Sequence, residues 1–97
     1  MRPIFILIVD DEPDITFSLE EILKEYGFVY VYAFNDPVEV ISKYTKPRIY
    51  YFLMIDIVMP KINGFELYEK IKKIDNKVKA CFITAADILQ IIKRDIS

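Results

Sequence analysis

Hydrophobic positions along this chain change their spacing several times, and each change predicts a new element. Uninterrupted apolar runs, rich in β-branched and aromatic residues as buried strands are, cover residues 4–9, 28–34 and 49–55, and residues 78–83 form a fourth strand-like run that Lys79 interrupts. Between them, apolar residues recur three or four positions apart, which is the spacing of helices that cover a sheet. These helical positions are Ile15, Leu19, Ile22, Leu23 and Tyr26, then Val38, Ile41 and Tyr44, then Leu67, Tyr68, Ile71 and Ile74, and finally Ile88, Ile91 and Ile92. The pattern predicts four strands that alternate with four helices.

Turn and capping residues support these boundaries. The acidic residues at 10–12 are followed by Pro13, and both proline and carboxylates favour the first turn of a helix. Gly27 suits the end of that helix, and the Asn-Asp-Pro sequence at 35–37 suits the start of the next. The pair Asn63-Gly64 is open to two interpretations, a hairpin turn or a helix start. The helical spacing and the charges that follow it favour the helix.

Alternation of strands and helices indicates an α/β protein with a parallel sheet and helices on both faces. Right-handed crossovers then restrict the topology to a few doubly wound sheets. The length of 97 residues predicts one domain over 1–97, and a composition of 54% hydrophobic and 29% charged residues suits a folded globular protein. In such sheets functional groups collect at the carboxyl ends of the strands.

Composition also excludes several classes of function. The net charge is −2, so no surface for nucleic acid or for an anionic membrane is indicated. The apolar runs are too short to cross a bilayer, and the acidic residues after the first run do not fit an export signal. The chain has no histidine and only two glycines, which excludes histidine-based chemistry and glycine-rich phosphate loops. Cys81 is the single cysteine, so no internal disulfide can form, which fits a cytoplasmic protein.

Three predicted strands end in residues that can carry chemistry. Asp10 and Asp11 follow the first strand, Asp56 follows the third, and Thr84 and Ala85 follow the fourth. Carboxylates brought together at one edge of a parallel sheet repel one another unless a cation lies between them, and Mg²⁺ prefers such oxygen ligands. A carboxylate can also attack phosphorus to give an aspartyl phosphate, whose oxygens a hydroxyl and a backbone N–H would hold. Thr84 supplies the hydroxyl, and the small Ala85 lets its N–H approach.

The segments ILIVDDEPD, MIDIVMPKINGFE and FITAAD resemble, in this order, the receiver domain of two-component response regulators. The resemblance implies a flavodoxin-like doubly wound sheet with strand order 2-1-3-4-5. It also implies that Asp56 is the phosphoacceptor and that a histidine kinase or phosphotransfer protein is the phosphodonor and partner. Asp11 and Asp56 would then bind Mg²⁺ directly, with Asp10 acting through water and Val58 through its carbonyl, and Thr84 would be the switch hydroxyl.

One departure from the family pattern concerns the end of the chain. Receivers have a fifth strand that ends in a lysine, then a fifth helix, whereas Lys93 is the sole lysine after Thr84 and falls within the predicted last helix. We therefore expect an incomplete receiver that lacks the fifth β-α unit. The first hypothesis is a phosphoacceptor receiver that is not an enzyme beyond its own phosphorylation and dephosphorylation. The alternative is a degenerate receiver that binds partner proteins without phosphorylation.

One weaker alternative and two further expectations complete the sequence analysis. An aspartyl-nucleophile phosphohydrolase is a weaker option, because Val58 stands where a second acid would act as general acid. Without a fifth strand, the edge of the fourth strand would be unpaired, so we expect self-association there if the chain is the whole protein. We also expect strong stabilisation by Mg²⁺, since no lysine offsets the acids.

Overall fold

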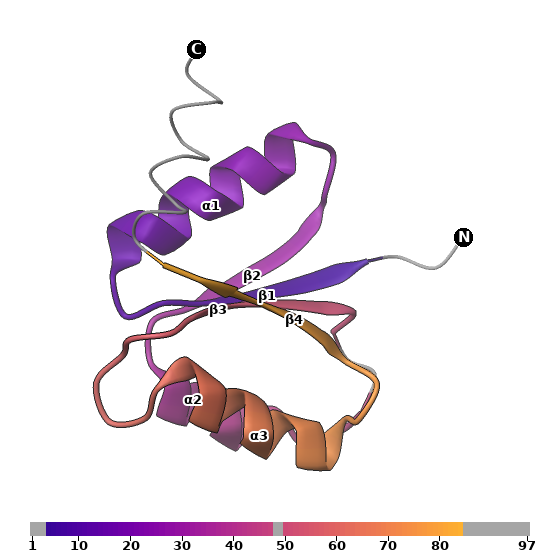
Figure 1. Cartoon of the computed structure of the whole chain (residues 1–97). Coiled ribbons are helices and arrows are strands. Elements are labelled where there is room, and N and C mark those ends of the chain that lie inside the picture. The colour runs from indigo at the N-terminus through magenta and orange to yellow at the C-terminus, as the bar shows by residue number, and fades with distance from the viewer. Residues whose placement is uncertain (1–3, 48–49, 85–97) are drawn as a thin grey trace.

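The computed structural model describes residues 4–47 and 50–84, which form alternating strands and helices. In chain order these elements are β1 (Phe5–Val9), α1 (Pro13–Glu25), β2 (Tyr30–Phe34), α2 (Pro37–Lys43), β3 (Phe52–Asp56), α3 (Gly64–Ile74) and β4 (Lys79–Ile83). All strand pairs are parallel, and the strand order is β2-β1-β3-β4. The predicted flavodoxin-like arrangement of these four strands is therefore confirmed (Figure 1). No helix within the described ranges is both long and apolar enough to span a membrane.

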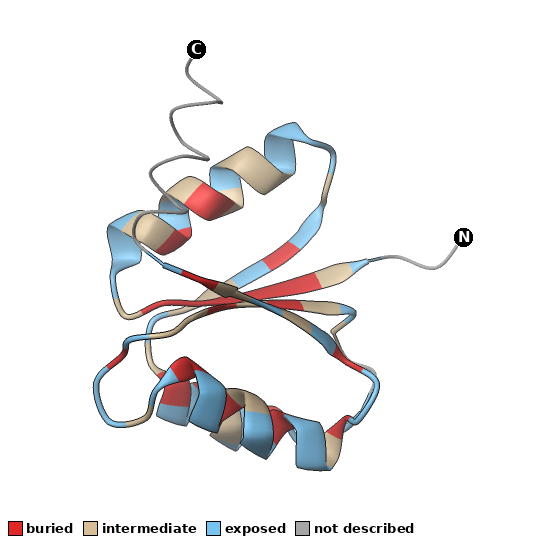
Figure 2. Cartoon of the chain, viewed as in Figure 1, coloured by how far each residue is buried: buried red, intermediate tan, exposed pale blue. Residues whose placement is uncertain are grey.

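The sheet forms the middle of three layers, with α1 on one face and α2 and α3 on the other (Figure 1). Alternate residues of β1 supply both cores, because successive side chains on a strand point to opposite faces. Ile6 and Ile8 pack in the core that contains Leu19 of α1, whereas Leu7 and Val9 pack in the core that contains α2 and α3 residues. Figure 2 shows the buried residues along the central strands and on the helix sides that face them.

Element boundaries differ from the sequence predictions in places. The second strand begins at Tyr30 and not at residue 28, because the Phe28 N–H donates to the Leu23 carbonyl (3.1 Å) and so closes the end of α1. Tyr26 and Val38, both predicted to face a core, are 71% and 46% exposed, so those two positions were wrong. Tyr26 follows the last residue of α1, and the seven-residue α2 buries Val40 in place of Val38. The predicted last helix lies outside the described residues.

Two polar interactions hold α2 and α3, the helices that cover one face of the sheet, in place. The Tyr44 hydroxyl, at the end of α2, donates to a carboxylate oxygen of Asp75 (2.9 Å), at the end of α3, and both residues are 2% exposed. At its start, α3 is capped reciprocally: Asn63 accepts from the Glu66 N–H (2.9 Å) and Glu66 accepts from the Asn63 N–H (3.2 Å). This capping box shows that Asn63-Gly64 starts a helix and is not a hairpin turn.

Candidate functional site

Three carboxylates meet at the carboxyl ends of the two central strands. Asp10 and Asp11 directly follow β1, and Asp56 is the last residue of β3, the neighbour of β1 in the sheet. One oxygen from each of these side chains lies within 4.8 Å of the other two. Adjacent parallel strands thus bring together residues that lie 45 or more positions apart in the sequence. An all-oxygen set of this kind suits a hard divalent cation such as Mg²⁺.

Asp10 is the most deeply buried of the three, with 3% of its surface exposed. Its N–H donates to the Phe34 carbonyl at the end of β2 (3.1 Å), and its side chain accepts from the Glu12 N–H (2.9 Å). The Asn35 side-chain amide donates to the Asp10 carbonyl (2.8 Å) and to the hydroxyl of the buried Thr16 (3.0 Å). Asp10 is therefore held in place by β2 on one side and by α1 on the other.

Sequence reasoning did not identify Asn35 and Thr16 as parts of this site. Asn35 was interpreted only as part of a helix-capping sequence, but the side chain that caps α2 is that of Asp36, which accepts from the Val38 N–H (2.9 Å). The available signal was position, because Asn35 follows a strand whose carboxyl end lies at the same edge as Asp10. Thr16 sits on α1 where a purely apolar position would have been expected, and its hydroxyl also donates to the Pro13 carbonyl (3.0 Å).

Two of the three carboxylates have raised pKa values. Burial raises the pKa of Asp10 from 3.8 to about 6, and the charges of Asp56, Asp11 and Glu12 act in the same direction against the Glu12 N–H bond. Burial also raises the pKa of Asp56, reinforced by the adjacent Asp11 carboxylate and opposed by the Val58 N–H. Both shifts go in the direction that burial and neighbouring negative charge produce in a carboxylate. A cation between them would reverse this repulsion.

Gly64 determines how closely α3 approaches Asp56. The Gly64 N–H donates to the Ile57 carbonyl (2.9 Å), so the chain returns to the end of β3 after the loop. A Cβ on Gly64 would overlap the backbone carbonyl oxygen of Asp56 and would lie 3.0 Å from a methyl carbon of Ile55. Its φ is not in the left-handed region, so close approach and not backbone conformation requires glycine here.

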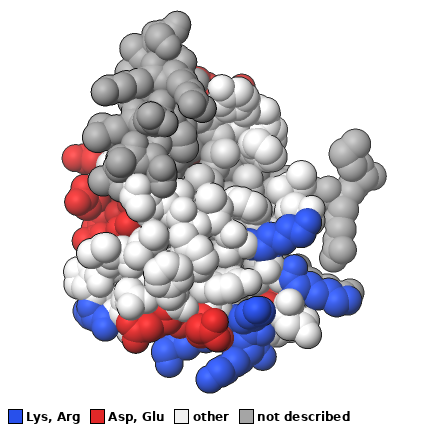
Figure 3. All heavy atoms as spheres, viewed as in Figure 1, with Lys and Arg blue, Asp and Glu red and all other residues white. Residues whose placement is uncertain are grey.

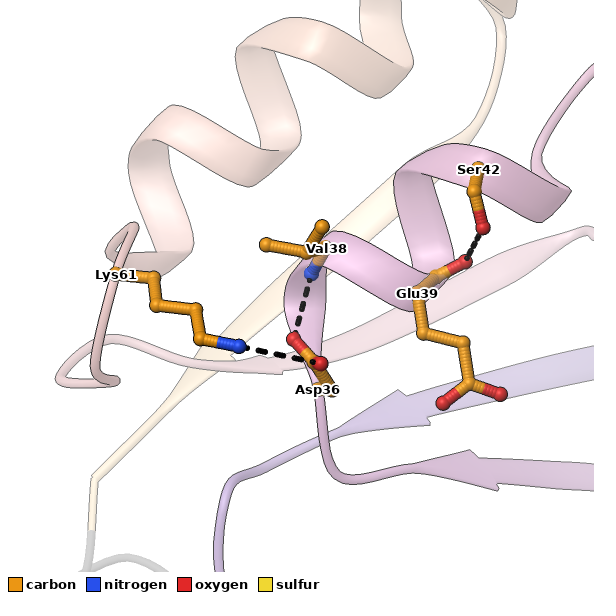
Figure 4. A network of polar contacts seen from close by, with 5 residues as sticks. All are labelled: Asp36, Val38, Glu39, Ser42 and Lys61. Carbon is orange, nitrogen blue, oxygen red and sulfur yellow. Dashed lines mark hydrogen bonds and ion pairs between the residues drawn. The ribbon is translucent and has the colours of Figure 1, made fainter.

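Two contacts hold the loop between β3 and α3 in place, one in the core and one with the start of α2. Met59 is 8% exposed and belongs to the core beneath α2 and α3, whereas Val58, the predicted carbonyl ligand, is 80% exposed. Lys61 adopts a left-handed φ of 71°, and its ammonium lies 3.4 Å from a carboxylate oxygen of Asp36. Figure 4 shows Lys61 reaching from this loop to Asp36 at the start of α2. The loop is thus connected to the neighbouring βα turn.

Thr84 lies at the same edge of the sheet. Asp56 is in register with Ile83 of β4, the Ile57 N–H donates to the Ile83 carbonyl (3.3 Å), and Thr84 follows directly and is exposed. The other predicted site residue at this strand end, Ala85, lies outside the described residues, as does Lys93 of the predicted last helix. On the face drawn in Figure 3, one group of acidic atoms lies at the left, which is the side of the strands' carboxyl ends in Figure 1, while acidic and basic atoms lie together along the bottom of the view.

Comparison with known proteins gives a consistent result. The family model described as response regulator receiver domain matches residues 6–96. The chemotaxis protein CheY of Treponema pallidum is 30% identical over 94 residues, which are 95% of this chain and 65% of that protein. The transcriptional regulatory protein TrcR of Mycobacterium tuberculosis is 33% identical over 87 residues, 88% of this chain and 32% of that protein. The Fimbriae Z protein of Escherichia coli K12 is 27% identical, and this chain spans 40% of its length.

Solved structures show the same similarity. The response regulator protein TrrA of Thermotoga maritima, in complex with Mg²⁺ and BeF, superposes with a TM-score of 0.76 at 34% identity, covering 84% of this chain and 70% of that one. TrrA in complex with the histidine kinase ThkA superposes with a TM-score of 0.74, again at 34% identity, covering 84% of this chain and 69% of that one.

Proposed function

The chain belongs to the response regulator receiver domain family, and on that premise we propose that it is a phosphoacceptor. Asp56 accepts a phosphoryl group from a histidine kinase or a phosphotransfer protein, with Mg²⁺ as the cofactor. The observation that carries the proposal is the set of three carboxylates whose oxygens lie within 4.8 Å at the ends of β1 and β3. We propose residues 1–97 as a single receiver domain that signals and does not turn over a separate substrate. Its cytoplasmic location stays a prediction.

We assign to these residues the roles that their resemblance to receiver domains implies. A carboxylate oxygen of Asp56 attacks phosphorus, a new P–O bond forms, and the bond from phosphorus to the donor nitrogen breaks with its electron pair leaving on the donor. Asp11 and Asp56 would hold the metal directly, and the Val58 carbonyl would add a ligand. The buried Asp10 would act through a bound water. When bound, Mg²⁺ would neutralise charge on the transferring oxygens.

The fourth strand completes the proposed site. Thr84, one residue beyond the partner of Asp56 in β4, would turn its hydroxyl toward a phosphoryl oxygen, and Ala85 would offer its N–H. Two observations on relatives support the proposal. TrrA was crystallised with Mg²⁺ and BeF, and it was crystallised with the histidine kinase ThkA.

The test is intact-mass spectrometry after incubation with acetyl phosphate and Mg²⁺, with the reaction quenched in acid. We expect the mass of one phosphoryl group on the wild-type chain and none on Asp56→Asn. The matched control is Asp14→Asn, which changes an exposed acid in the first turn of α1 and should be phosphorylated like the wild type. Phosphorylation of Asp56→Asn, or none of the wild type, would contradict the proposal. If the wild type is not phosphorylated but binds its partner, and Asp56→Asn binds equally well, the phosphorylation-independent alternative is favoured.

A further inference from the structure

The outer edge of β2 has the features of a pairing surface. β2 is the first strand in the sheet order, and within the described ranges no strand lies beyond it. Residues 28–34, FVYVYAF, contain no charged residue, no proline and no glycine. Natural proteins usually protect sheet edges with charges, prolines, bulges or very short strands. β2 has none of these side-chain protections.

The register of the sheet identifies which backbone groups of β2 are available. The Phe34 carbonyl accepts from the Asp10 N–H (3.1 Å), so the backbone polar groups of Phe34 point toward β1. The direction of the backbone N–H and carbonyl groups alternates from one residue to the next along a strand. The groups of Tyr32 and Tyr30, two and four residues before Phe34, therefore also point toward β1, with which these residues are in register. The N–H and carbonyl groups of Val31 and Ala33 therefore point away from the sheet. They form a short ladder that can accept another strand.

Side chains on one face of this edge are ordered before any partner binds. Tyr30 and Tyr32 are each 43% exposed, and both rings stack on Phe5, with centroids 4.7 and 6.2 Å away. Tyr32 also contacts the edge of Tyr50 (6.0 Å), which contacts Tyr44 of the core (5.7 Å). Rings that are held in place lose little conformational entropy on binding, and tyrosine is enriched at protein interfaces for this reason.

The opposite edge of the described sheet is less suited to pairing. β4 carries the exposed Lys79, whose ammonium lies over the ring of Tyr51 at 5.6 Å. A lysine on an edge strand is a common obstacle to pairing with another chain. The sequence alone predicted self-association through β4. The structure favours β2, where no charge lies on the strand and Lys43, over the ring of Phe34, is already paired with Glu39 (3.0 Å).

We propose that two copies of this chain pair antiparallel through the outer edges of their β2 strands and form one continuous sheet. A second copy fits because such an edge is complementary to itself under a twofold rotation. With Val31 opposite Val31, the two residues exchange both backbone hydrogen bonds, Tyr30 faces the second copy's Tyr32, and Val29 faces its Ala33. This register opposes no like charges and joins the two aromatic clusters into one.

The first test is sedimentation of the full chain over a concentration series up to about 1 mM, with Tyr32→Lys as the disrupting variant. We expect a reversible dimer for the wild type and at least a tenfold weaker dissociation constant for Tyr32→Lys. Ala33→Pro removes one outward N–H without removing a bond to β1, and it should weaken the dimer in the same way. Phe17→Lys, a matched change at a 65% exposed residue of α1, should leave the dissociation constant unchanged. Thermal melts establish that each variant is folded.

The second test fixes the register. In a Cys81→Ser background, Tyr30→Cys chains mixed with Tyr32→Cys chains should form an intermolecular disulfide faster than either variant alone, since the proposed register places these positions opposite each other. A monomeric wild type at every concentration overturns the proposal. An interface disrupted by Cys81→Lys on β4 but not by Tyr32→Lys also overturns it, and assigns the contact to the other edge.

Discussion

Replacing Asp10 by asparagine should stabilise the metal-free protein at neutral pH. The folded protein holds a proton on Asp10 up to about pH 6, whereas the unfolded chain releases it near pH 3.8. The folded state therefore binds more protons between these values, and its free energy of unfolding falls as the pH rises through this window. A shift of about two pKa units at about 1.4 kcal/mol each corresponds to ~3 kcal/mol lost by pH 7.5. Asparagine avoids this loss and can still accept the Glu12 N–H bond.

The assay is thermal and urea unfolding in a chelator at pH 4 and pH 7.5, repeated with Mg²⁺. At pH 7.5 without metal, Asp10→Asn should be more stable by about 3 kcal/mol, or roughly 15 °C in Tm for a domain of this size. At pH 4 the difference should nearly vanish, because Asp10 is then protonated in the folded protein. Mg²⁺ should stabilise the wild type strongly and the variant less. The reasoning would be refuted if Asp10→Asn were less stable than the wild type at pH 7.5, or if its stability differed from that of the wild type by the same amount at both pH values.

Three further variants test the surroundings of the site and the helix that supports it. Gly64→Ala should destabilise the protein by about 1–3 kcal/mol and weaken Mg²⁺ stabilisation, because the added Cβ meets the Asp56 carbonyl. The control Gly27→Ala, at φ 98° with no atom near the added Cβ, should cost about 1 kcal/mol of conformational strain and leave the Mg²⁺ effect intact. Equal effects of the two variants on Mg²⁺ would contradict this. Tyr44→Phe keeps the ring but removes the donor to the buried Asp75, so urea unfolding should show a loss of about 1–3 kcal/mol; an unchanged midpoint would show that the bond is not stabilising. Asn63→Ala removes the capping box of α3, and its free energy of unfolding in urea should be about 1 kcal/mol lower than that of the wild type. The control Asn76→Ala, which changes an exposed residue beyond the helix, should have the stability of the wild type.

Much of the fold could be read from periodicity, because it follows from local rules. A run such as 4–9 has too many consecutive apolar residues for anything but a buried segment, and the acid-proline sequence before α1 starts a helix whatever lies nearby. Boundaries were less predictable. Phe28 and Val29 have the residue types of a strand, but the backbone of Phe28 is used to close α1, which only the three-dimensional path of the chain reveals.

The sequence by itself determined the residue types of the candidate site and the edge of the sheet at which they lie. Acids after the first and third strands of a parallel sheet must emerge on the same side, so Asp10, Asp11 and Asp56 were identifiable without coordinates. Only the tertiary structure decided how close they lie and how deeply Asp10 is buried, since both depend on strands that are distant in the chain. It also decided the role of Asn35, the need for glycine at residue 64, and which strands form the edges of the described sheet. Each of these depends on how segments approach one another in space, and the pattern of residues along the chain does not specify that approach.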